Sequence, residues 1–138
     1  MHRKQFLKTS CSFCVLASAG FFVSTLPSCA TAILFKNKDN KIAVPVSFFA
    51  KNDLQIIRTR EAEFDIALRK EKDGSYTALL LKCTHADNAL TSTGNSFICT
   101  LHGSKFDIEG LVTKGPAVHT LQKYHTQVIS DHVIITLQ

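Results

Sequence analysis

Cys83-Thr84-His85 and Cys99-Thr100-Leu101-His102 are the two stretches of this 138-residue sequence that decide its fold. Each stretch brings a thiol and an imidazole close together, and both groups are common metal ligands. Zinc binds two Cys and two His, but its usual spacings pair Cys with Cys and His with His. Mixed pairs suit two loop tips that reach across a two-iron cluster, each giving one residue to each iron. The spacing therefore favours an iron–sulfur cluster, and a structural zinc site remains the alternative.

The residues that follow the second pair carry a wider resemblance. Residues 99–110, CTLHGSKFDIEG, resemble the second ligand loop of the Rieske iron–sulfur family, and residues 114–117, KGPA, are similar to the proline-bearing segment that covers the cluster there. The resemblance extends from about residue 40 to the C-terminus. It implies an all-β fold, a Rieske-type antiparallel β-sandwich or partial barrel with a small cluster-binding subdomain at about residues 83–117.

The resemblance also implies a cofactor and its ligands. A Rieske centre is a [2Fe–2S] cluster in which two histidines replace two cysteines on one of the irons. In this chain Cys83 and Cys99 would hold one iron, and His85 and His102 would hold the other. These four are the predicted metal- and cofactor-binding residues, and no catalytic residue is predicted.

Four neighbouring residues are predicted to shape the site. Gly103 follows a ligand where the loop must turn sharply, and a residue without Cβ permits both the turn and a close approach of backbone N–H groups to sulfur. The resemblance places Ser104 at a serine that donates to a bridging sulfide in high-potential members, and Phe106 at a tyrosine that donates to a cysteine sulfur. Pro116 belongs to the covering segment. One donor kept and one missing predict a reduction potential below that of quinol-oxidising members, because donors to sulfur favour the reduced cluster.

Three further positions depart from the family pattern. Asp87 stands where the family usually has glycine, so this turn must adopt a conformation that Asp tolerates. Asn88 and Leu101 stand where quinol-oxidising members carry an extra pair of cysteines joined as a disulfide. In this respect the chain is closer to the soluble Rieske ferredoxins.

The first 29 residues have the pattern of an export signal. They open with basic residues at Arg3, Lys4 and Lys8, and residues 9–35 carry no charge. The stretch 3–8, RKQFLK, resembles a twin-arginine motif with its second arginine replaced by lysine. That route exports folded proteins, which suits a cluster inserted in the cytosol.

The signal can end in three ways. Residues 26–29, LPSC, resemble a bacterial lipobox, in which case Cys29 becomes a lipidated N-terminus. The uncharged stretch also exceeds the ~20 residues that cross a bilayer, so it could remain as a helical anchor. Plain secretion is the third outcome. We favour the lipoprotein, which places the domain on the periplasmic side of a bacterial membrane.

These patterns divide the chain into an export signal or membrane anchor at 1–29, a linker at 30–39 and a Rieske-like domain at 40–138. Of five cysteines, Cys11 and Cys14 lie in the signal, so none is left for a disulfide once Cys29 and the two ligands are assigned. Removing the three basic residues of the signal lowers the formal net charge from +5 to +2. No basic cluster is interleaved with aromatic residues, so nucleic acid is not an expected partner.

Short runs with alternating or β-branched apolar residues predict strands at 42–48, 63–68, 76–81 and 133–137. Residues 70–74, KEKDG, predict a turn between two of them. Pro45 lies inside the first run, which predicts a sheet edge or a bulge because proline cannot donate a ladder hydrogen bond.

The sequence thus predicts an exported, membrane-tethered, one-electron carrier with a [2Fe–2S] cluster. Its partners would be a redox donor and acceptor, either proteins or quinol. No flavin motif or nucleophile–base pair is present, so the chain is not expected to be a complete enzyme. The alternatives are a Rieske subunit of a larger membrane or periplasmic oxidoreductase, and a structural zinc domain.

Overall fold

A computed structural model describes residues 34–35, 37–60 and 62–137 of the chain. The chain divides into two units, Met1–Ala30 and Thr31–Gln138, of which the first lies outside the described residues. The described elements are β-strands and one short 3-10 helix, η1 (Val46–Ala50), which confirms the all-β prediction. No helix in this described part has the length and apolar character needed to cross a membrane.

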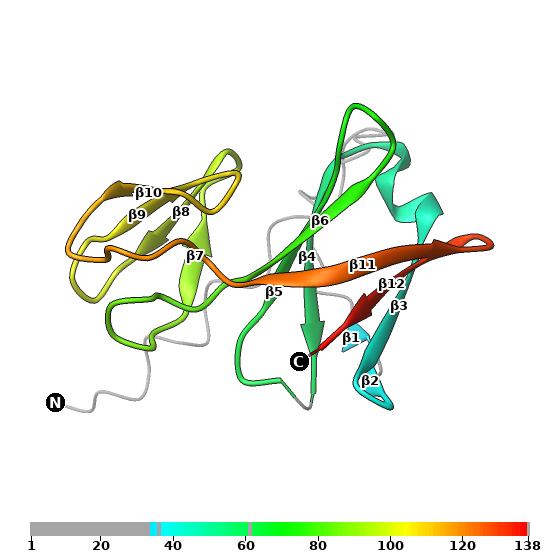
Figure 1. Ribbon diagram of the computed structural model, residues 1–138, viewed down its shortest axis with the longest axis horizontal. Coiled ribbons are helices and arrows are strands. Elements are labelled where there is room, and N and C mark those ends of the chain that lie inside the picture. The colour runs from blue at the N-terminus through cyan, green and yellow to red at the C-terminus, as the bar shows by residue number, and fades with distance from the viewer. Residues whose placement is uncertain (1–33, 36, 61, 138) are drawn as a thin grey trace, which may run out of the picture. The chain divides into compact units, whose positions relative to one another are not determined.

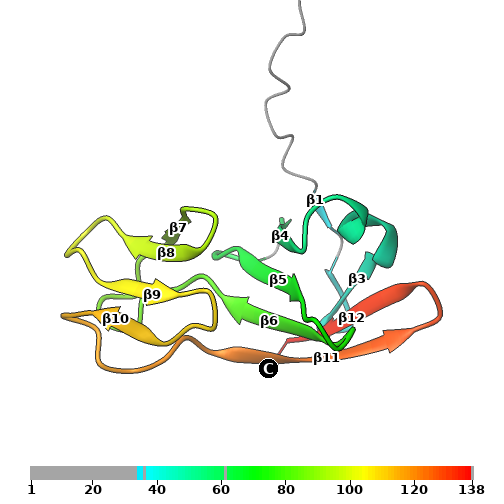
Figure 2. The same cartoon turned by 90° about the horizontal axis from the view of Figure 1, so that it is seen from above.

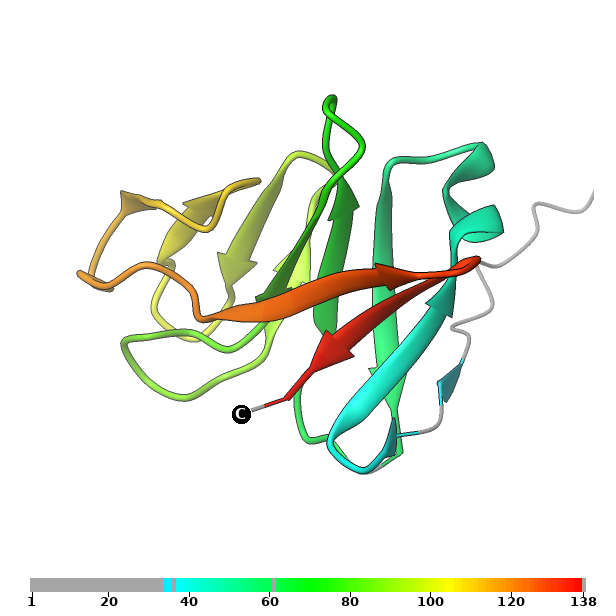
Figure 3. The same cartoon turned by 45° about the vertical axis from the view of Figure 1, so that its right-hand side comes forward.

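The larger sheet has eight strands and is antiparallel except where β1 pairs with β4. It curls around its own core, as Figures 1 and 3 show. In spatial order its strands are β1 (Leu34–Phe35), β4 (Leu54–Thr59), β5 (Ile66–Lys70), β6 (Tyr76–Leu80), β11 (Lys123–Ile129), β12 (His132–Thr136), β3 (Lys41–Pro45) and β2 (Asn37–Lys38).

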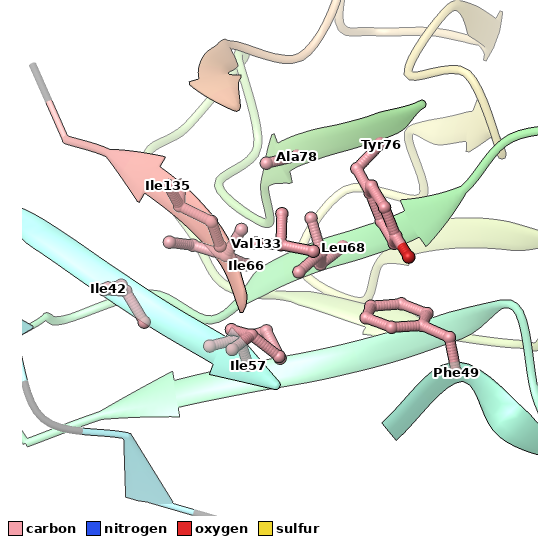
Figure 4. Close-up of a cluster of buried hydrophobic side chains, with 10 residues drawn as sticks. Ile42, Phe49, Ile57, Ile66, Leu68, Tyr76, Ala78, Val133 and Ile135 are labelled. Carbon is pink, nitrogen blue, oxygen red and sulfur yellow. The ribbon is translucent and has the colours of Figure 1, made fainter. Parts of the chain in front are cut away.

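The core of this sheet follows from the period-two pattern of its strands. Buried and more exposed residues alternate in β3 and β12, because successive side chains of a strand point to opposite faces. Phe49, from η1, packs edge-on against Tyr76 at a ring-centroid distance of 4.9 Å. The buried residues, most of them labelled in Figure 4, are Ile42, Val44, Phe49, Ile57, Ile66, Leu68, Tyr76, Ala78, Val133 and Ile135.

The turn predicted at 70–74 is confirmed. Strands β5 and β6 pair antiparallel, with Lys70 opposite Tyr76. The Asp73 carboxylate accepts the Ser75 hydroxyl at 2.6 Å and the Ser75 N–H at 2.9 Å, and these two contacts hold the pKa of Asp73 below its usual value. Gly74 adopts φ +85°, a conformation that favours glycine.

Other predicted boundaries shift. The strand predicted at 42–48 ends at Pro45 and continues as η1, and the strand predicted at 63–68 begins only at Ile66. Pro45 has a partner in β12 but none in β2, which pairs only with Lys41 and Ile42. Its position is therefore a local edge, as predicted. Residues 34–35 and 37–38, within the stretch assigned to a linker, contribute β1 and β2 to the sheet.

The smaller sheet is inserted between two neighbouring strands of the larger one. Its four strands lie in the order β10 (Val112–Lys114), β9 (Lys105–Asp107), β8 (Ser96–Cys99) and β7 (Leu90–Ser92). The chain leaves the larger sheet after β6 and returns at β11, and these two strands pair. Figure 2 shows the two segments that connect the sheets, one after β6 and one before β11. The insertion has its own buried core, which includes Phe97, Phe106 and both Cys83 and Cys99.

Candidate metal centre

Two loops at the rim of the smaller sheet carry the predicted ligands, and their backbones follow the same pattern. Each loop begins at a cysteine and closes on it, through one bond to the cysteine N–H and one to its carbonyl. The bonds join Cys83 N to Asn88 O (2.8 Å), Asp87 N to Cys83 O (3.1 Å), Cys99 N to Ser104 O (2.9 Å) and Gly103 N to Cys99 O (2.9 Å). The two loops, 83–88 and 99–104, are therefore equivalent units that differ in where the histidine falls.

The fifth residue of each loop has a positive φ, which makes the sharp turn. In the second loop this residue is Gly103, at φ +79°, and no atom lies within 4 Å of where its Cβ would be. Glycine is therefore required there for its backbone conformation rather than for space. In the first loop the residue is Asp87, at φ 45°, and its carboxylate lies 3.1 Å from the Lys82 ammonium. The prediction of a turn that Asp tolerates is confirmed, since Asp is one of the few residues that enter this region readily.

The loops bury the two sulfurs and expose the two imidazoles. Cys83 and Cys99 are fully buried, and both thiols are free of disulfides. The rings of His85 and His102 lie on the exposed surface, with centroids 5.0 Å apart and planes 83° apart. The structure thus brings the four predicted residues together as a thiol pair and an imidazole pair.

The surroundings of Cys99 favour its thiolate form. Burial raises the pKa of the thiol, but the N–H groups of Leu101 and His102 and the side chains of Cys83 and Asn88 hydrogen-bond to the sulfur and lower the pKa below its ordinary value. A thiolate is the form that binds metal.

The arrangement fits a two-metal cluster better than a single ion. The two thiols are buried beneath the loops, whereas the two imidazoles lie side by side on the exposed surface. A structural zinc site needs its four ligands around one point, whereas a Rieske-type cluster needs two around each iron. The donor set and its division into two pairs therefore fit a dinuclear centre.

Comparison with known protein families assigns the chain. Residues 34–125 match the model of the Rieske [2Fe-2S] domain. The chain belongs to the Rieske [2Fe–2S] domain family. Proteins of this domain bind a [2Fe–2S] cluster, so the cofactor expected from the resemblance is confirmed.

The relatives that the chain resembles include iron–sulfur subunits of the cytochrome b6-f complex. The subunit of Prochlorococcus marinus is 40% identical over 72 residues, which cover 51% of this chain and 40% of the relative. That of Trichodesmium erythraeum is 39% identical over 56 residues, which cover 39% of this chain and 31% of the relative. The matched region thus spans less than half the length of these relatives.

Solved structures share the fold at low identity. A chain in the complex of reduced oxygenase and oxidized ferredoxin in carbazole 1,9a-dioxygenase is 19% identical with a TM-score of 0.51, covering 72% of this chain and 94% of that one. Naphthalene 1,2-dioxygenase with indole bound is 18% identical with a TM-score of 0.51, covering 76% of this chain and 26% of that one. These similarities support the Rieske fold alone.

The Rieske domain holds its second loop against the segment that follows β10. Ser104 is fully buried, and its hydroxyl oxygen accepts the Ala117 N–H at 3.0 Å. Because that oxygen acts as acceptor, the hydroxyl proton remains available for a second partner. Pro116 precedes Ala117 in this segment and is exposed. Phe106 is fully buried opposite Phe97 in the sheet register, where it packs in the core and offers no donor.

Two contacts at the site were not foreseen from the sequence. The Thr84 hydroxyl donates to the His119 carbonyl at 2.7 Å, which ties the first loop to the same segment that holds Ser104. The Asn88 side-chain amide lies 3.8 Å from the Cys99 sulfur. The only sequence signal for either contact was a polar residue within the first ligand loop.

Proposed function

We propose that this protein transfers single electrons through a Rieske [2Fe–2S] cluster. In this proposal Cys83 and Cys99 hold one iron, and His85 and His102 hold the other. The supporting observation is a pair of buried free thiols and a pair of exposed imidazoles on two equivalent loops. When bound, such a cluster supplies one-electron exchange at roughly −150 to +300 mV.

The protein residues determine how an electron reaches the site. The buried thiols and the apolar core beneath them exclude water from the sulfur side. The exposed imidazoles form the contact surface for a redox partner. Apolar side chains are exposed in the same segments: Leu101 is 56% exposed beside His102, and Val118 is 78% exposed beside the covering segment. A partner would therefore meet exposed apolar side chains beside the imidazoles, together with the charged side chains of Asp87 and Lys105 in the same region.

The cluster assignment is tested by metal and sulfide content after anaerobic purification. We expect iron and acid-labile sulfide in equal amounts and an EPR signal after dithionite reduction. Cys83→Ser and His102→Ala should abolish the signal. His119→Gln is the matched control, because His119 contributes only its carbonyl to the site. Zinc without sulfide in the wild-type protein would reject the proposal and restore the zinc alternative.

A second candidate function is that of a subunit in a larger oxidoreductase. It is favoured by the names of the relatives, which are subunits of the cytochrome b6-f complex. In that role the donor or acceptor, a protein or quinol, lies within the assembly. Co-purification with a larger redox protein under mild solubilisation would support the subunit, and a monomeric protein reduced by a diffusible donor would support the free carrier.

We also propose an export signal or anchor at 1–29, a linker at 30–39 whose residues 34–35 and 37–38 pair into the larger sheet, and the Rieske domain at 40–138, with Cys29 lipidated on the periplasmic side of the membrane. The support is the charge pattern and the lipobox-like residues 26–29. These residues lie outside the described part of the structure. Mass spectrometry of the membrane-bound protein should find an acylated N-terminus at Cys29 that is lost in Cys29→Ala. A retained Met1 would favour the uncleaved anchor, and an unmodified soluble product would favour secretion.

A further inference from the structure

The side chain of Asn88 lies between the two ligand loops. Its Nδ2 is 3.2 Å from the Ala89 carbonyl oxygen and 3.8 Å from the Cys99 sulfur. Sulfur is larger than oxygen, so hydrogen bonds to it are longer. The orientation of the amide is determined by chemistry, because a carbonyl and a thiolate are both acceptors and each requires the NH2 end.

The position of Asn88 within its loop gives this contact a particular role. Asn88 and Ser104 are the sixth residues of two equivalent loops, and the carbonyl of each accepts the N–H of its own loop's cysteine. The side chain of each then leaves its loop. Ser104 contacts Ala117 in the covering segment, whereas Asn88 contacts the cysteine of the opposite loop. Asn88 is therefore a direct side-chain link from the first loop to a sulfur of the second.

We propose that the Asn88 amide donates a hydrogen bond to the Cys99 sulfur, which links the two ligand loops and raises the reduction potential of the centre. This inference rests on the proposed cluster function. A donor to a ligand sulfur stabilises the more negative, reduced state over the oxidised state. Phe106 supplies no donor, whereas the Ser104 hydroxyl keeps its proton free for a second partner. Asn88 thus acts as a positioning residue through Cys99.

The expected effect is modest because the contact is long and only partly buried. Removal of the amide should shift the equilibrium toward the oxidised state about threefold to tenfold, which is a potential lowered by about 30–60 mV for a one-electron couple. Asn88→Ala removes the donor and keeps the backbone carbonyl that closes the loop. Asn88→Asp keeps the shape of the side chain but replaces the donor with a negatively charged acceptor, so it should lower the potential further.

The experiment compares reduction potentials by protein-film voltammetry in the full chain, with Asn95→Ala as the matched control. Asn95 is an exposed asparagine in the turn between β7 and β8. Electron–nuclear double resonance on the reduced protein supplies an independent signature, an exchangeable proton coupling that is present in wild type and Asn95→Ala and absent from Asn88→Ala. Circular dichroism and iron content establish that each variant is folded and loaded.

The outcomes separate this inference from the proposed function. A wild-type protein without iron and sulfide would contradict the function itself. A loaded Asn88→Ala variant with the potential and proton coupling of wild type would overturn the inference and leave the function intact. If Asn88→Ala is folded but binds no cluster, the Asn88→Asp potential decides, and a value equal to wild type overturns the inference.

Discussion

Ser104→Ala tests how the second ligand loop is held. The Ser104 oxygen accepts the Ala117 N–H at 3.0 Å, and both residues are buried, with exposed fractions of 0% and 3%. The alanine variant leaves this N–H without a partner and closed off from water. An unsatisfied buried donor costs about 1–3 kcal/mol, whereas an exposed hydroxyl lost from a surface costs less than about 0.5 kcal/mol. The unpaired N–H therefore dominates the expected loss of stability.

The assay is thermal unfolding of the cluster-loaded protein under anaerobic conditions, together with hydrogen exchange at the Ala117 amide. Each kcal/mol lost should lower Tm by roughly 4–8 °C in a domain of this size, and exchange at Ala117 should accelerate. The reduction potential should also fall if the cluster is bound, because the hydroxyl proton of Ser104 is not used by Ala117 and would be free to donate toward the cluster. Ser96→Ala is the control, since it removes an exposed hydroxyl that contacts only the Thr93 hydroxyl in its turn. A Ser104→Ala protein that matches Ser96→Ala in Tm and potential would refute both parts of the reasoning.

Three further predictions concern the rest of the domain. Gly110→Ala should destabilise the domain by about 1–3 kcal/mol more than Gly74→Ala, as measured by urea unfolding. Both glycines have a positive φ, but of the two only Gly110 lies where a Cβ would meet leucine side chains, at 3.1–3.2 Å. Equal losses of stability would show that space at Gly110 is not limiting. Asp65→Asn removes a 2.5 Å ion pair with Arg58 that raises the pKa of Arg58. Because Arg58 is 53% exposed, the free energy of unfolding should fall by no more than about 1 kcal/mol. A larger loss of stability, or one that does not depend on salt concentration, would contradict this. Burial raises the pKa of Tyr124, and the Lys82 ammonium group opposes this in part, so the folded state binds the phenolic proton more tightly than the unfolded state. The free energy of unfolding should therefore fall as pH rises above about 10. Tyr124→Phe should lose part of this dependence in denaturation curves recorded at alkaline pH, and an unchanged dependence would argue against the prediction.

The ligand loops could be predicted from the sequence because their chemistry is local. Cysteine, histidine and glycine occur there at short spacings, and Gly103 has the positive φ that its place after a ligand required. The hairpin at Gly74 was equally accessible, since Asp-Gly sequences mark turns. The strand boundaries near Pro45 were not, because the period-two apolar pattern continues to Phe48, whereas the chain forms a 3-10 helix from Val46 to Ala50 in which Phe49 packs on Tyr76. That choice depends on a long-range packing partner.

The cross-loop contacts were inaccessible for a related reason. Asn88 is separated from Cys99 by a complete hairpin, and Thr84 from His119 by most of the inserted sheet. No periodicity or spacing links such residues, and only the register of β7 with β8 brings the first pair together. From the sequence, Asn88 signified only the absence of a cysteine. In the structure its amide approaches the sulfur of the opposite loop.

These contacts bear on how the loops keep their geometry without a disulfide. The side chain of Asn88 links the first loop to Cys99 of the second. Thr84 and Ser104 link the first and second loops, respectively, to the backbone of His119 and Ala117. At about 0.5–1.5 kcal/mol each, the sum of these three links is roughly 1.5–4.5 kcal/mol, which overlaps the 2–4 kcal/mol typical of a disulfide. The two solutions differ in chemistry more than in strength, since a hydrogen bond is not broken by a thiol reductant. The cluster site of this chain should therefore keep its potential and its Tm in excess dithiothreitol, whereas a disulfide-linked pair of loops would lose both.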